Sequence, residues 1–286
     1  MIVAGSVSQS LAAALSLELD HPLAVAEYDR FPDGEQTVAI PELAERDVTE
    51  AVLVASTPTD AAHVELLLLQ DAIREAGVEE LTTVIPYLGY ARQDEAFEPG
   101  QPISARAMAR AASTSTDRVL TVNPHEEVVH TFFDVHTTSV DAARFLADPL
   151  PSDLADPLFL SPDAGALSIA STVAEAYGGG EVDHFEKTRH SGSEVEVAPS
   201  DAAVGNRDVV IVDDIVATGS TMAEAIAALD MPARVFVSCV HGVLAGNARS
   251  KLARAGVSGV WATDTLERAE SAVSVAPAVA EAVRKT

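Results

Sequence analysis

The chain has 286 residues, of which 44 are acidic and 18 are lysine or arginine, so its formal net charge is −26. At about 150 residues per domain this length predicts two domains, and an apolar content of 48% excludes a disordered chain. Binding to nucleic acid or to an anionic membrane surface needs a basic face that displaces counterions from phosphates. We therefore expect neither kind of partner.

The number of cysteines and the N-terminal residues indicate the cellular compartment of the protein. The single cysteine, Cys239, excludes an intramolecular disulfide and any metal site built from several cysteines. Met1 leads directly into the apolar residues 2–4 without a basic region, and no apolar run reaches the roughly 18 residues of a membrane-spanning helix. These features predict a cytoplasmic protein.

The choice of basic residues is uneven, because lysine occurs only at positions 187, 251 and 285. An acidic surface of this strength is typical of halophilic proteins, although an ordinary acidic protein is the simpler alternative. Repulsion among so many carboxylates destabilises the folded state unless salt screens it, and the Debye length falls to about 3 Å at molar salt. We favour the halophilic interpretation.

Taken in chain order, short apolar runs alternate with helical stretches. This pattern predicts an α/β fold with mostly parallel sheets flanked by helices. Helices are predicted at Asp60–Ala76, which Gly77 would end, at Thr221–Leu229 and from about Val275 onward. The predicted strands are Ile2–Ala4, Ala51–Ser56, Leu81–Pro86, Arg118–Val122, Leu158–Ser161, Asp208–Asp213, Arg234–Val240 and Gly259–Ala262.

The domain boundary is predicted between the strands at Arg118–Val122 and Leu158–Ser161. The segment ADPLPSDLADP at 147–157 contains three prolines and three aspartates, a composition that favours a linker. It divides the chain into an N-terminal domain of residues 1–146 and a C-terminal domain of residues 147–286. The strand, loop and helix of AVLVASTPTDAAHVELLLL (51–69) are similar to those of VVIVDDIVATGSTMAEAIAAL (209–229), which suggests duplication of one α/β unit.

The most informative segment is 209–221, where a β-branched run ends in Asp213 and Asp214 and is followed by a turn of small residues and a helix. In an open α/β sheet, ligands bind at the carboxyl ends of the strands. Backbone amides and hydroxyl groups of the 217–221 turn could hold a phosphate at the helix N-terminus, and the two carboxylates could accept hydrogen bonds from a ribose. The alternative is an ordinary strand end followed by a helix cap.

These residues resemble the motif with which the phosphoribosyltransferase fold binds 5-phosphoribosyl-1-pyrophosphate (PRPP). The fold is shared by enzymes that consume PRPP and by the one that makes it, so this motif does not name a reaction. Further motifs resemble, in the right order, those of the ribose-phosphate pyrophosphokinase family. They are RFPDGE (30–35), YARQDE (90–95), PISA (102–105), NPHEEVVHTFFDV (123–135), SPDAG (161–165) and EKTR (186–189).

The resemblance implies two similar phosphoribosyltransferase-type domains and transfer of the β,γ-diphosphoryl group of Mg-ATP to the 1-hydroxyl of ribose 5-phosphate, giving PRPP and AMP. It implies that the C-terminal tail 275–286 belongs with the first domain. It also implies a homo-oligomer, because Phe31, Asp33 and Glu35 would reach the adenine from a neighbouring subunit.

The remaining roles implied by the resemblance fall into four groups. Lys187 and Arg189 would be catalytic residues on a mobile clamp, and the rarity of lysine in this chain supports a function for Lys187. Mg²⁺ would be bound by His125 and Asp163. ATP would contact Arg92, Gln93 and Asp94, and ribose 5-phosphate would contact Asp213, Asp214, Ala217, Thr218, Gly219, Ser220 and Thr221.

Two positions depart from the family pattern. Ala166 stands where a second glycine is common in the pyrophosphate-binding loop, and Ala217 stands where many members have a third acid. The Ala217 departure favours a PRPP-consuming transferase as the alternative. A non-catalytic regulatory subunit that keeps the fold is a further alternative. Neither a Walker A motif nor GxGxxG occurs, so ATP would bind without a P-loop.

Overall fold

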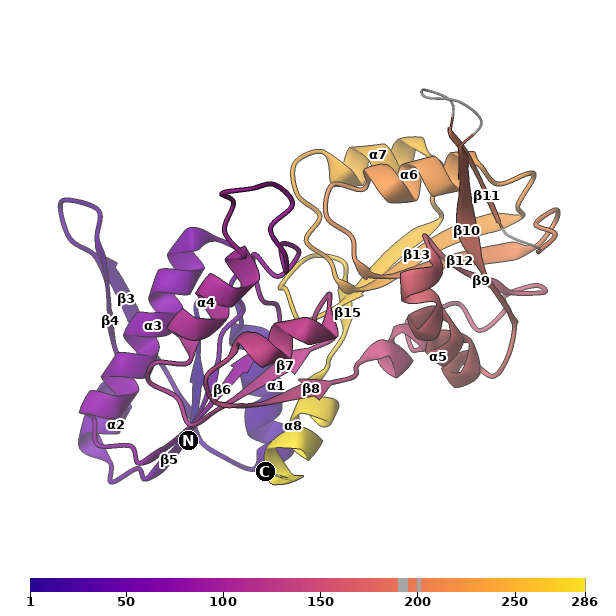
Figure 1. Cartoon of the computed structure of the whole chain (residues 1–286). Coiled ribbons are helices and arrows are strands. Elements are labelled where there is room, and N and C mark those ends of the chain that lie inside the picture. The colour runs from indigo at the N-terminus through magenta and orange to yellow at the C-terminus, as the bar shows by residue number, and fades with distance from the viewer. Residues whose placement is uncertain (190–194, 200–201, 286) are drawn as a thin grey trace. The chain divides into compact units, whose positions relative to one another are not determined.

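The computed structural model describes residues 1–189, 195–199 and 202–285, and gives the backbone alone for residues 187–189 and 195–198. The chain forms two compact units (Figure 1). Unit 1 consists of residues 1–141, 264–267 and 274–286, and unit 2 consists of residues 142–263 and 268–273. Within these described ranges, no helix combines the length and apolarity needed to cross a membrane.

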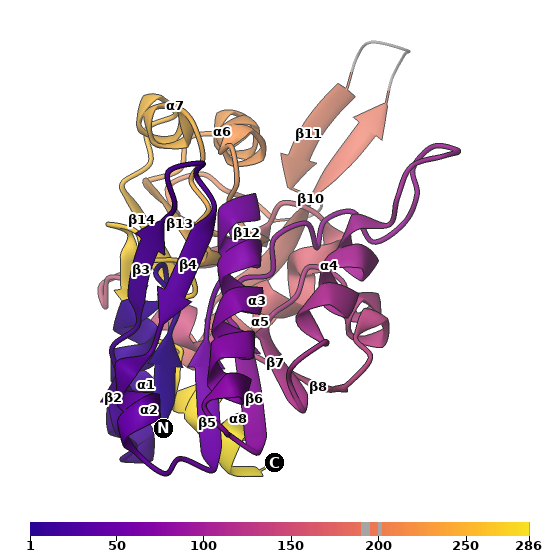
Figure 2. The ribbon, with the colours of Figure 1, turned by 90° about the vertical axis from the view of Figure 1, so that its left-hand side faces the viewer.

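Unit 1 is built on a six-stranded parallel sheet with the strand order β2-β1-β5-β6-β7-β8. A separate antiparallel hairpin of β3 and β4 lies alongside helix α3 (Figure 2). The strands are β1 (Ile2–Ala4), β2 (Leu23–Ala24), β3 (Glu27–Arg30), β4 (Gln36–Ala39), β5 (Glu50–Val54), β6 (Glu80–Ile85), β7 (Arg118–Val122) and β8 (His136–Val140).

Helices cover both faces of this sheet. The chain leaves β1 toward β2 and leaves β5 in the other direction toward β6, so right-handed crossovers place α1 and α3 on opposite faces. Figure 1 shows α3 with α4 on one side and α1 with α8 on the other. The helices are α1 (Gln9–Leu19), α2 (Pro41–Glu45), α3 (Asp60–Glu75), α4 (Ser104–Ala112), the 3₁₀ helix η1 (Glu127–Phe132) and α8 (Ala276–Lys285).

Helix α3 shows how the sequence determines one of these elements. Leu66, Leu69 and Ile73 recur on one face and are at most 1% exposed in the core of unit 1, and burying each contributes about 2 kcal/mol. The helix begins after Thr59, whose hydroxyl oxygen accepts a hydrogen bond from the amide of Ala62 at 3.2 Å. Asp60 adds a negative charge to its first turn.

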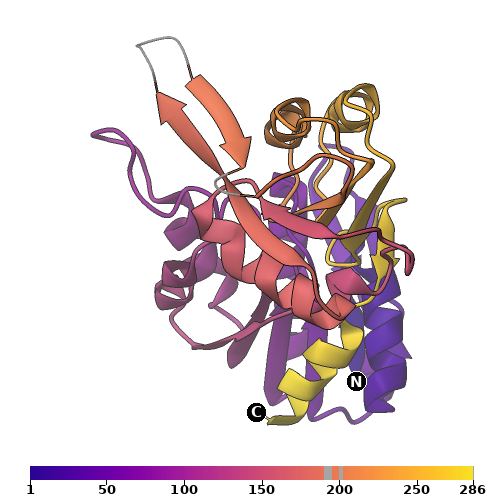
Figure 3. The ribbon, with the colours of Figure 1, turned by 90° about the vertical axis from the view of Figure 1, so that its right-hand side faces the viewer.

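Unit 2 contains a seven-stranded sheet with the order β11-β10-β9-β12-β13-β14-β15, in which only the β10–β11 pair is antiparallel. The β10–β11 hairpin extends beyond the helices of the unit (Figure 3). The strands are β9 (Leu158–Ser161), β10 (Glu181–Arg189), β11 (Val195–Pro199), β12 (Asp208–Ile215), β13 (Arg234–His241), β14 (Gly259–Thr263) and β15 (Ser271–Val273).

The helices of unit 2 follow the same crossover rule. The connection from β9 to β10 places α5 on one face, and the connections from β12 to β14 place α6 and α7 on the other (Figure 1). The helices are the 3₁₀ helices η2 (Ala143–Ala147) and η3 (Ala164–Ala166), followed by α5 (Leu167–Tyr177), α6 (Ser220–Ala227) and α7 (Ala248–Arg254).

The predicted α/β class is confirmed, with a mostly parallel sheet and flanking helices in each unit. All the predicted strands and helices are present, with ends within two residues of the predicted ones. The strands that were not predicted are β2, β3, β4, β8, β10, β11 and β15. Many of these are exposed or short, and β3 (EYDR) is exposed along its whole length, so no apolar alternation marks it.

The linker interpretation of residues 147–157 is wrong, because this segment is packed within unit 2 and the units divide between Asp141 and Ala142. The Tyr177 hydroxyl on α5 donates to the carbonyl of Pro151 at 2.8 Å, and the Ala155 amide donates to the Asp208 carboxylate at 2.6 Å. Proline and aspartate are also typical of turns that lie on a domain surface. Composition alone therefore did not distinguish a linker from a packed turn.

The C-terminal segment 274–286 falls in unit 1. Its helix α8 packs on α1, and the Arg284 side chain donates a hydrogen bond to the carbonyl of Glu18.

Candidate active site

The sheet of unit 2 has a topological switch point between β9 and β12. From β9 the chain crosses to β10 on one side, whereas from β12 it crosses to β13 on the other. The two strands are parallel neighbours, with Leu160 paired to Ile211, so their carboxyl ends lie at the same edge. Ligands of open α/β sheets bind at such an edge, and Asp163, Asp213 and Asp214 follow or end these strands.

These three carboxylates form an acid cluster, defined here as Asp163, Asp213 and Asp214. Burial raises the pKa of Asp213, and the negative charges of Asp214 and Asp163 raise it further. Asp163 is exposed, and its Oδ1 accepts a hydrogen bond from the amide of Gly165 at 2.9 Å. Carboxylate oxygens are the ligands that a hard divalent cation such as Mg²⁺ prefers. Among the described residues, no group of three or more His, Cys, Asp or Glu side chains is placed to hold a metal ion by itself.

The 217–221 turn joins β12 to α6 and leaves the start of that helix open. Gly219 is the N-cap with φ = 69°, a left-handed conformation that glycine adopts without strain. A Cβ at Gly219 would also lie 3.2 Å from the carbonyl oxygen of Ala248. Because a glycine has no side chain to cap the helix and no acid occupies the first turn, the first amides of α6 can receive an anion.

The hydroxyl groups of this turn come from Thr218, Ser220 and Thr221, of which Thr218 and Thr221 are exposed. Ser220 Oγ accepts a hydrogen bond from Lys251 Nζ at 2.7 Å. The sequence motifs did not single out Lys251. The signal that could have found it is the scarcity of lysine in this chain.

The two departures from the family pattern occupy different environments. Ala166 is 8% exposed, so its methyl group is buried in unit 2, whereas Gly165 is exposed. Ala217 is partly buried, and its carbonyl accepts a hydrogen bond from the amide of Ala245 at 2.9 Å. Neither Ala166 nor Ala217 has a positive φ, so neither position requires a glycine.

In unit 1, the predicted nucleotide residues follow two neighbouring parallel strands, β6 and β7. The loop after β6 carries Arg92, Gln93 and Asp94, and the loop after β7 carries His125, so both loops leave the same edge of the sheet. The Gln93 Oε1 accepts a hydrogen bond from Ser104 Oγ at 2.5 Å, which fixes the side chain. Arg92 and His125 are exposed.

Residues 31–35 form the tip of the β3–β4 hairpin. The amide of Phe31 donates to the carbonyl of Glu35 at 2.8 Å, and the Glu35 amide donates to Asp33 Oδ1 at 3.2 Å. Gly34 permits the turn with φ = 94°. Phe31 is 53% exposed, and its hairpin is separate from the six-stranded sheet.

Lys187 and Arg189 lie on β10, where their backbones pair with Val197 and Val195 of β11. Their side chains are outside the part of the chain that the structure describes. The structure thus brings the acid cluster and the 217–221 turn to one edge of unit 2, and the Arg92 and His125 loops to one edge of unit 1.

Comparison with known proteins gives consistent matches along the chain. Residues 1–115 match the N-terminal domain of ribose phosphate pyrophosphokinase, and residues 136–254 match the phosphoribosyl transferase domain. A ribose-phosphate pyrophosphokinase from Halobacterium salinarum is 62% identical, with 99% of this chain and 100% of that protein covered. One from Methanosarcina acetivorans is 42% identical, with 99% of each chain covered.

The fold comparison agrees with these matches. The crystal structure of phosphoribosylpyrophosphate synthetase from Mycobacterium smegmatis is similar with a TM-score of 0.83 and 28% sequence identity, covering 99% of this chain and 97% of the other. The matches extend over both units, and they include the N-terminal domain as well as the PRPP-type turn. The chain therefore belongs to the ribose-phosphate pyrophosphokinase family.

Proposed function

We propose that this chain transfers the β,γ-diphosphoryl group of ATP to the 1-hydroxyl of ribose 5-phosphate, giving PRPP and AMP. The observation that carries the proposal is the edge of unit 2, where the acid cluster stands beside a helix start that Gly219 leaves uncapped. Relatives of 62% and 42% identity that carry the name ribose-phosphate pyrophosphokinase support it.

The 217–221 turn is the proposed site of the 5-phosphate. The amides at the start of α6 and the turn hydroxyls would donate to the phosphate oxygens. Asp213 and Asp214 would accept hydrogen bonds from the ribose hydroxyls, which orients the 1-hydroxyl for the reaction. Ala217 would contribute its backbone, because its side chain carries no polar group.

The proposed nucleotide residues lie on unit 1. The guanidinium of Arg92 would contact phosphate oxygens, and the amide of Gln93, held by Ser104, would contact the nucleotide. Asp94 completes this loop. The exposed ring of Phe31, with Asp33 and Glu35, would hold the adenine of a neighbouring subunit, and this makes the functional form a homo-oligomer.

Mg²⁺ is the proposed cofactor, with His125 and Asp163 as its protein contacts. The exposed Asp163 carboxylate in the acid cluster fits a hard cation. Mg²⁺ usually takes one or two carboxylates and completes its shell with water and substrate phosphates, and His125 fits best through a water molecule. Once bound, the ion would neutralise charge on the phosphate oxygens during transfer.

Lys187 and Arg189 are the proposed catalytic residues. Phosphoryl transfer depends mainly on positioning and on the stabilisation of charge on the transferred group. Two cations on a hairpin that extends beyond the helices could supply that charge. The reaction is proposed to take place in the cytoplasm, where a single buried free thiol, Cys239, suits a reducing compartment.

The test is an assay of the purified full-length chain at molar KCl with MgCl₂, ATP and ribose 5-phosphate. Wild type is expected to release AMP and PRPP. Lys187→Ala is expected to lower kcat by about 10³-fold or more, as removal of a transition-state cation does in other phosphoryl transfers, while ATP binding stays measurable. Lys285→Ala is the matched control, because Lys285 pairs with Glu281 on the exposed side of α8.

Each failure has a distinct meaning in this assay. Wild-type rates in Lys187→Ala would remove the catalytic role of that residue. Absence of AMP with the wild-type chain alone would favour the regulatory subunit. Ala217, whose methyl group replaces a third acid, is the feature that favours a PRPP-consuming transferase, and PRPP consumption without AMP release would support that alternative.

A further inference from the structure

The start of helix α7 and the segment that leads into it pack against residues 216–219. The amide of Leu244 donates to the carbonyl of Val216 at 3.0 Å, and the amide of Ala245 donates to Ala217 at 2.9 Å. At Gly219 the approach is so close that an added Cβ would lie within 3.4 Å of three Ala248 atoms. Helices α6 and α7 consequently lie side by side, as Figures 1 and 2 both show.

Lys251 lies on α7 about one turn after Ala248, and its ammonium reaches the first residue of α6. Lys251 Nζ donates to Ser220 Oγ at 2.7 Å, and Thr218 Oγ1 donates to the same oxygen at 3.3 Å. An ammonium group can only donate, and a hydroxyl oxygen has two acceptor positions and one proton. Both acceptor positions of Ser220 are therefore occupied, and its own proton is left to be donated to another group.

We propose that Lys251 is a positioning residue for ribose 5-phosphate, acting through Ser220. By occupying the acceptor side of the Ser220 hydroxyl, it fixes that hydroxyl as a donor to the phosphate oxygen bound at the start of α6. The inference rests on the proposed function, because it requires the 217–221 turn to bind the 5-phosphate.

A purely structural role for Lys251 would be to hold α7 in place, but another side chain on the same helix already does this. Arg249 forms a two-point ion pair with Glu270, with Nε–Oε1 at 2.6 Å and Nη2–Oε2 at 2.8 Å. Lys251 instead donates to a hydroxyl of the turn. Arg249 thus provides a control from the same helix whose guanidinium donates to Glu270 instead of to a hydroxyl of the turn.

The experiment measures binding of ribose 5-phosphate to the full-length chain by calorimetry at molar KCl, together with KM values and unfolding temperatures. Lys251→Met is expected to weaken ribose 5-phosphate binding at least tenfold and to raise its KM similarly, with the KM for ATP unchanged. Lys251→Arg is expected to restore most of the affinity, because it retains a cationic donor. Arg249→Met should lower the unfolding temperature without changing ribose 5-phosphate affinity.

Ser220→Ala provides the second measurement. Because Lys251 acts through Ser220, adding Lys251→Met to Ser220→Ala should change the affinity by less than twofold. Wild-type ribose 5-phosphate affinity in Lys251→Met would overturn the proposal. So would additive losses in the double variant, or a loss of affinity for both substrates that Lys251→Arg does not restore.

These outcomes are separate from those that test the proposed reaction. The binding measurement uses no ATP. A wild-type chain that binds ribose 5-phosphate but releases no AMP would contradict the proposed reaction, and the test of Lys251 would still apply. A wild-type chain that does not bind ribose 5-phosphate would overturn both the phosphate site and the role of Lys251.

Discussion

At the scale of single residues, the edge of unit 2 contains an arrangement of carboxylates that lowers the stability of the fold. Asp213 is partly buried next to two other carboxylates, which raise its pKa together with the burial. A buried carboxylate among like charges destabilises the folded state at neutral pH. Strongly shifted pKa values of this kind cluster at functional sites.

Replacing Asp213 by Asn should therefore separate stability from function. The amide oxygen can still accept the hydrogen bond that the Asp214 amide donates at 3.0 Å, while the ionisable carboxyl group, whose charged form is opposed by burial and by its neighbours, is removed. We expect the variant to be more stable by about 1–2 kcal/mol in the absence of Mg²⁺ and substrate. Its affinity for ribose 5-phosphate should fall by about tenfold or more, because the amide nitrogen of Asn cannot accept a hydrogen bond where a carboxyl oxygen can.

Chemical denaturation and calorimetry on the same samples would measure both effects. Asp230→Asn, in the turn after α6, is the control for the loss of one negative charge. A variant Asp213→Asn that is less stable than wild type would contradict the repulsion described for the acid cluster.

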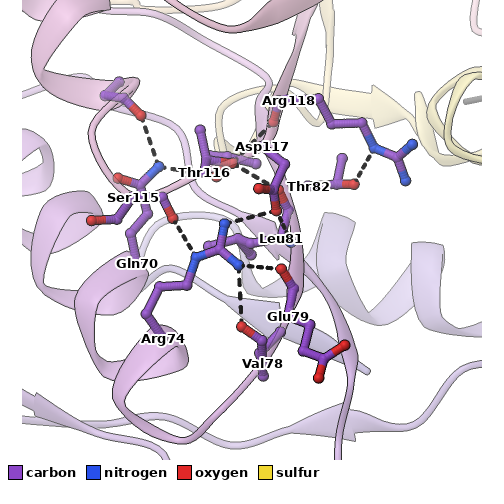
Figure 4. A network of polar contacts seen from close by, with 12 residues as sticks. Gln70, Arg74, Val78, Glu79, Leu81, Thr82, Ser115, Thr116, Asp117 and Arg118 are labelled. Carbon is purple, nitrogen blue, oxygen red and sulfur yellow. Dashed lines mark hydrogen bonds and ion pairs between the residues drawn. The ribbon is translucent and has the colours of Figure 1, made fainter.

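At the scale of elements, the amino-terminal edge of the unit 1 sheet is held by one arginine on α3 (Figure 4). Arg74 donates to the carbonyls of Ser115, Val78 and Glu79 at 3.0, 3.1 and 2.7 Å, and to Asp117 Oδ2 at 2.7 Å. The same carboxylate oxygen accepts the amide of Leu81 at 2.6 Å. The loops before β6 and β7 are thereby fixed, and these strands lead to the Arg92 and His125 loops at the other end.

Removal of this guanidinium should destabilise unit 1. Arg74→Met keeps most of the aliphatic stem but removes the donor of three carbonyls and the ion-pair partner of Asp117, which keeps only the hydrogen bond from the Leu81 amide among those described above. We expect a loss of about 2–3 kcal/mol in the free energy of unfolding. Urea unfolding measures the change. Arg110→Met, an exposed arginine in the last turn of α4, should change it by less than about 0.5 kcal/mol.

The elements most accessible to prediction were the buried strands. Runs such as 209–212 are apolar on both faces of the sheet, and this signal is strong in sequence. β3 and β10 carry mostly polar or charged residues, and in β11 the apolar alternation is limited to the five residues VEVAP, so cross-strand backbone pairing defines these strands more than their sequence does.

The candidate site could be proposed from the sequence where its residues are contiguous, as in the 217–221 turn. Lys251 was missed because its contact with Ser220 joins residues 31 positions apart, on different helices. That contact depends on the packing of α7 against Gly219, and residue spacing along the sequence does not predict it. The linker interpretation failed for the same reason, since the contacts of 147–157 are with residues far along the chain.

At the scale of the whole molecule, the dominant property is the formal charge of −26. Repulsion among surface carboxylates acts over the Debye length, which shortens from about 10 Å at 0.1 M salt to about 3 Å at 1 M. The relative of 62% identity from Halobacterium salinarum agrees with a protein adapted to such conditions. Screening should also ease the approach of ATP and ribose 5-phosphate, which are themselves polyanions.

The unfolding temperature should accordingly rise with salt. Between 0.1 M and 2 M KCl we expect an increase of about 10 °C or more, since each kcal/mol moves the midpoint by a few degrees in a protein of this size. Differential scanning calorimetry with the full chain measures it. A midpoint that stays constant or falls over this range would show that charge repulsion does not limit the stability.

The starts of helices α3 and α6 have a consequence for how many substrate molecules one chain can take up. In unit 1 the Thr59 hydroxyl already fills the role of an anion at the first turn, and Asp60 would repel a phosphate. In unit 2 the corresponding place after β12 has neither. A calorimetric titration should therefore saturate at a stoichiometry of one ribose 5-phosphate per polypeptide, even though the strand, loop and helix pattern occurs twice.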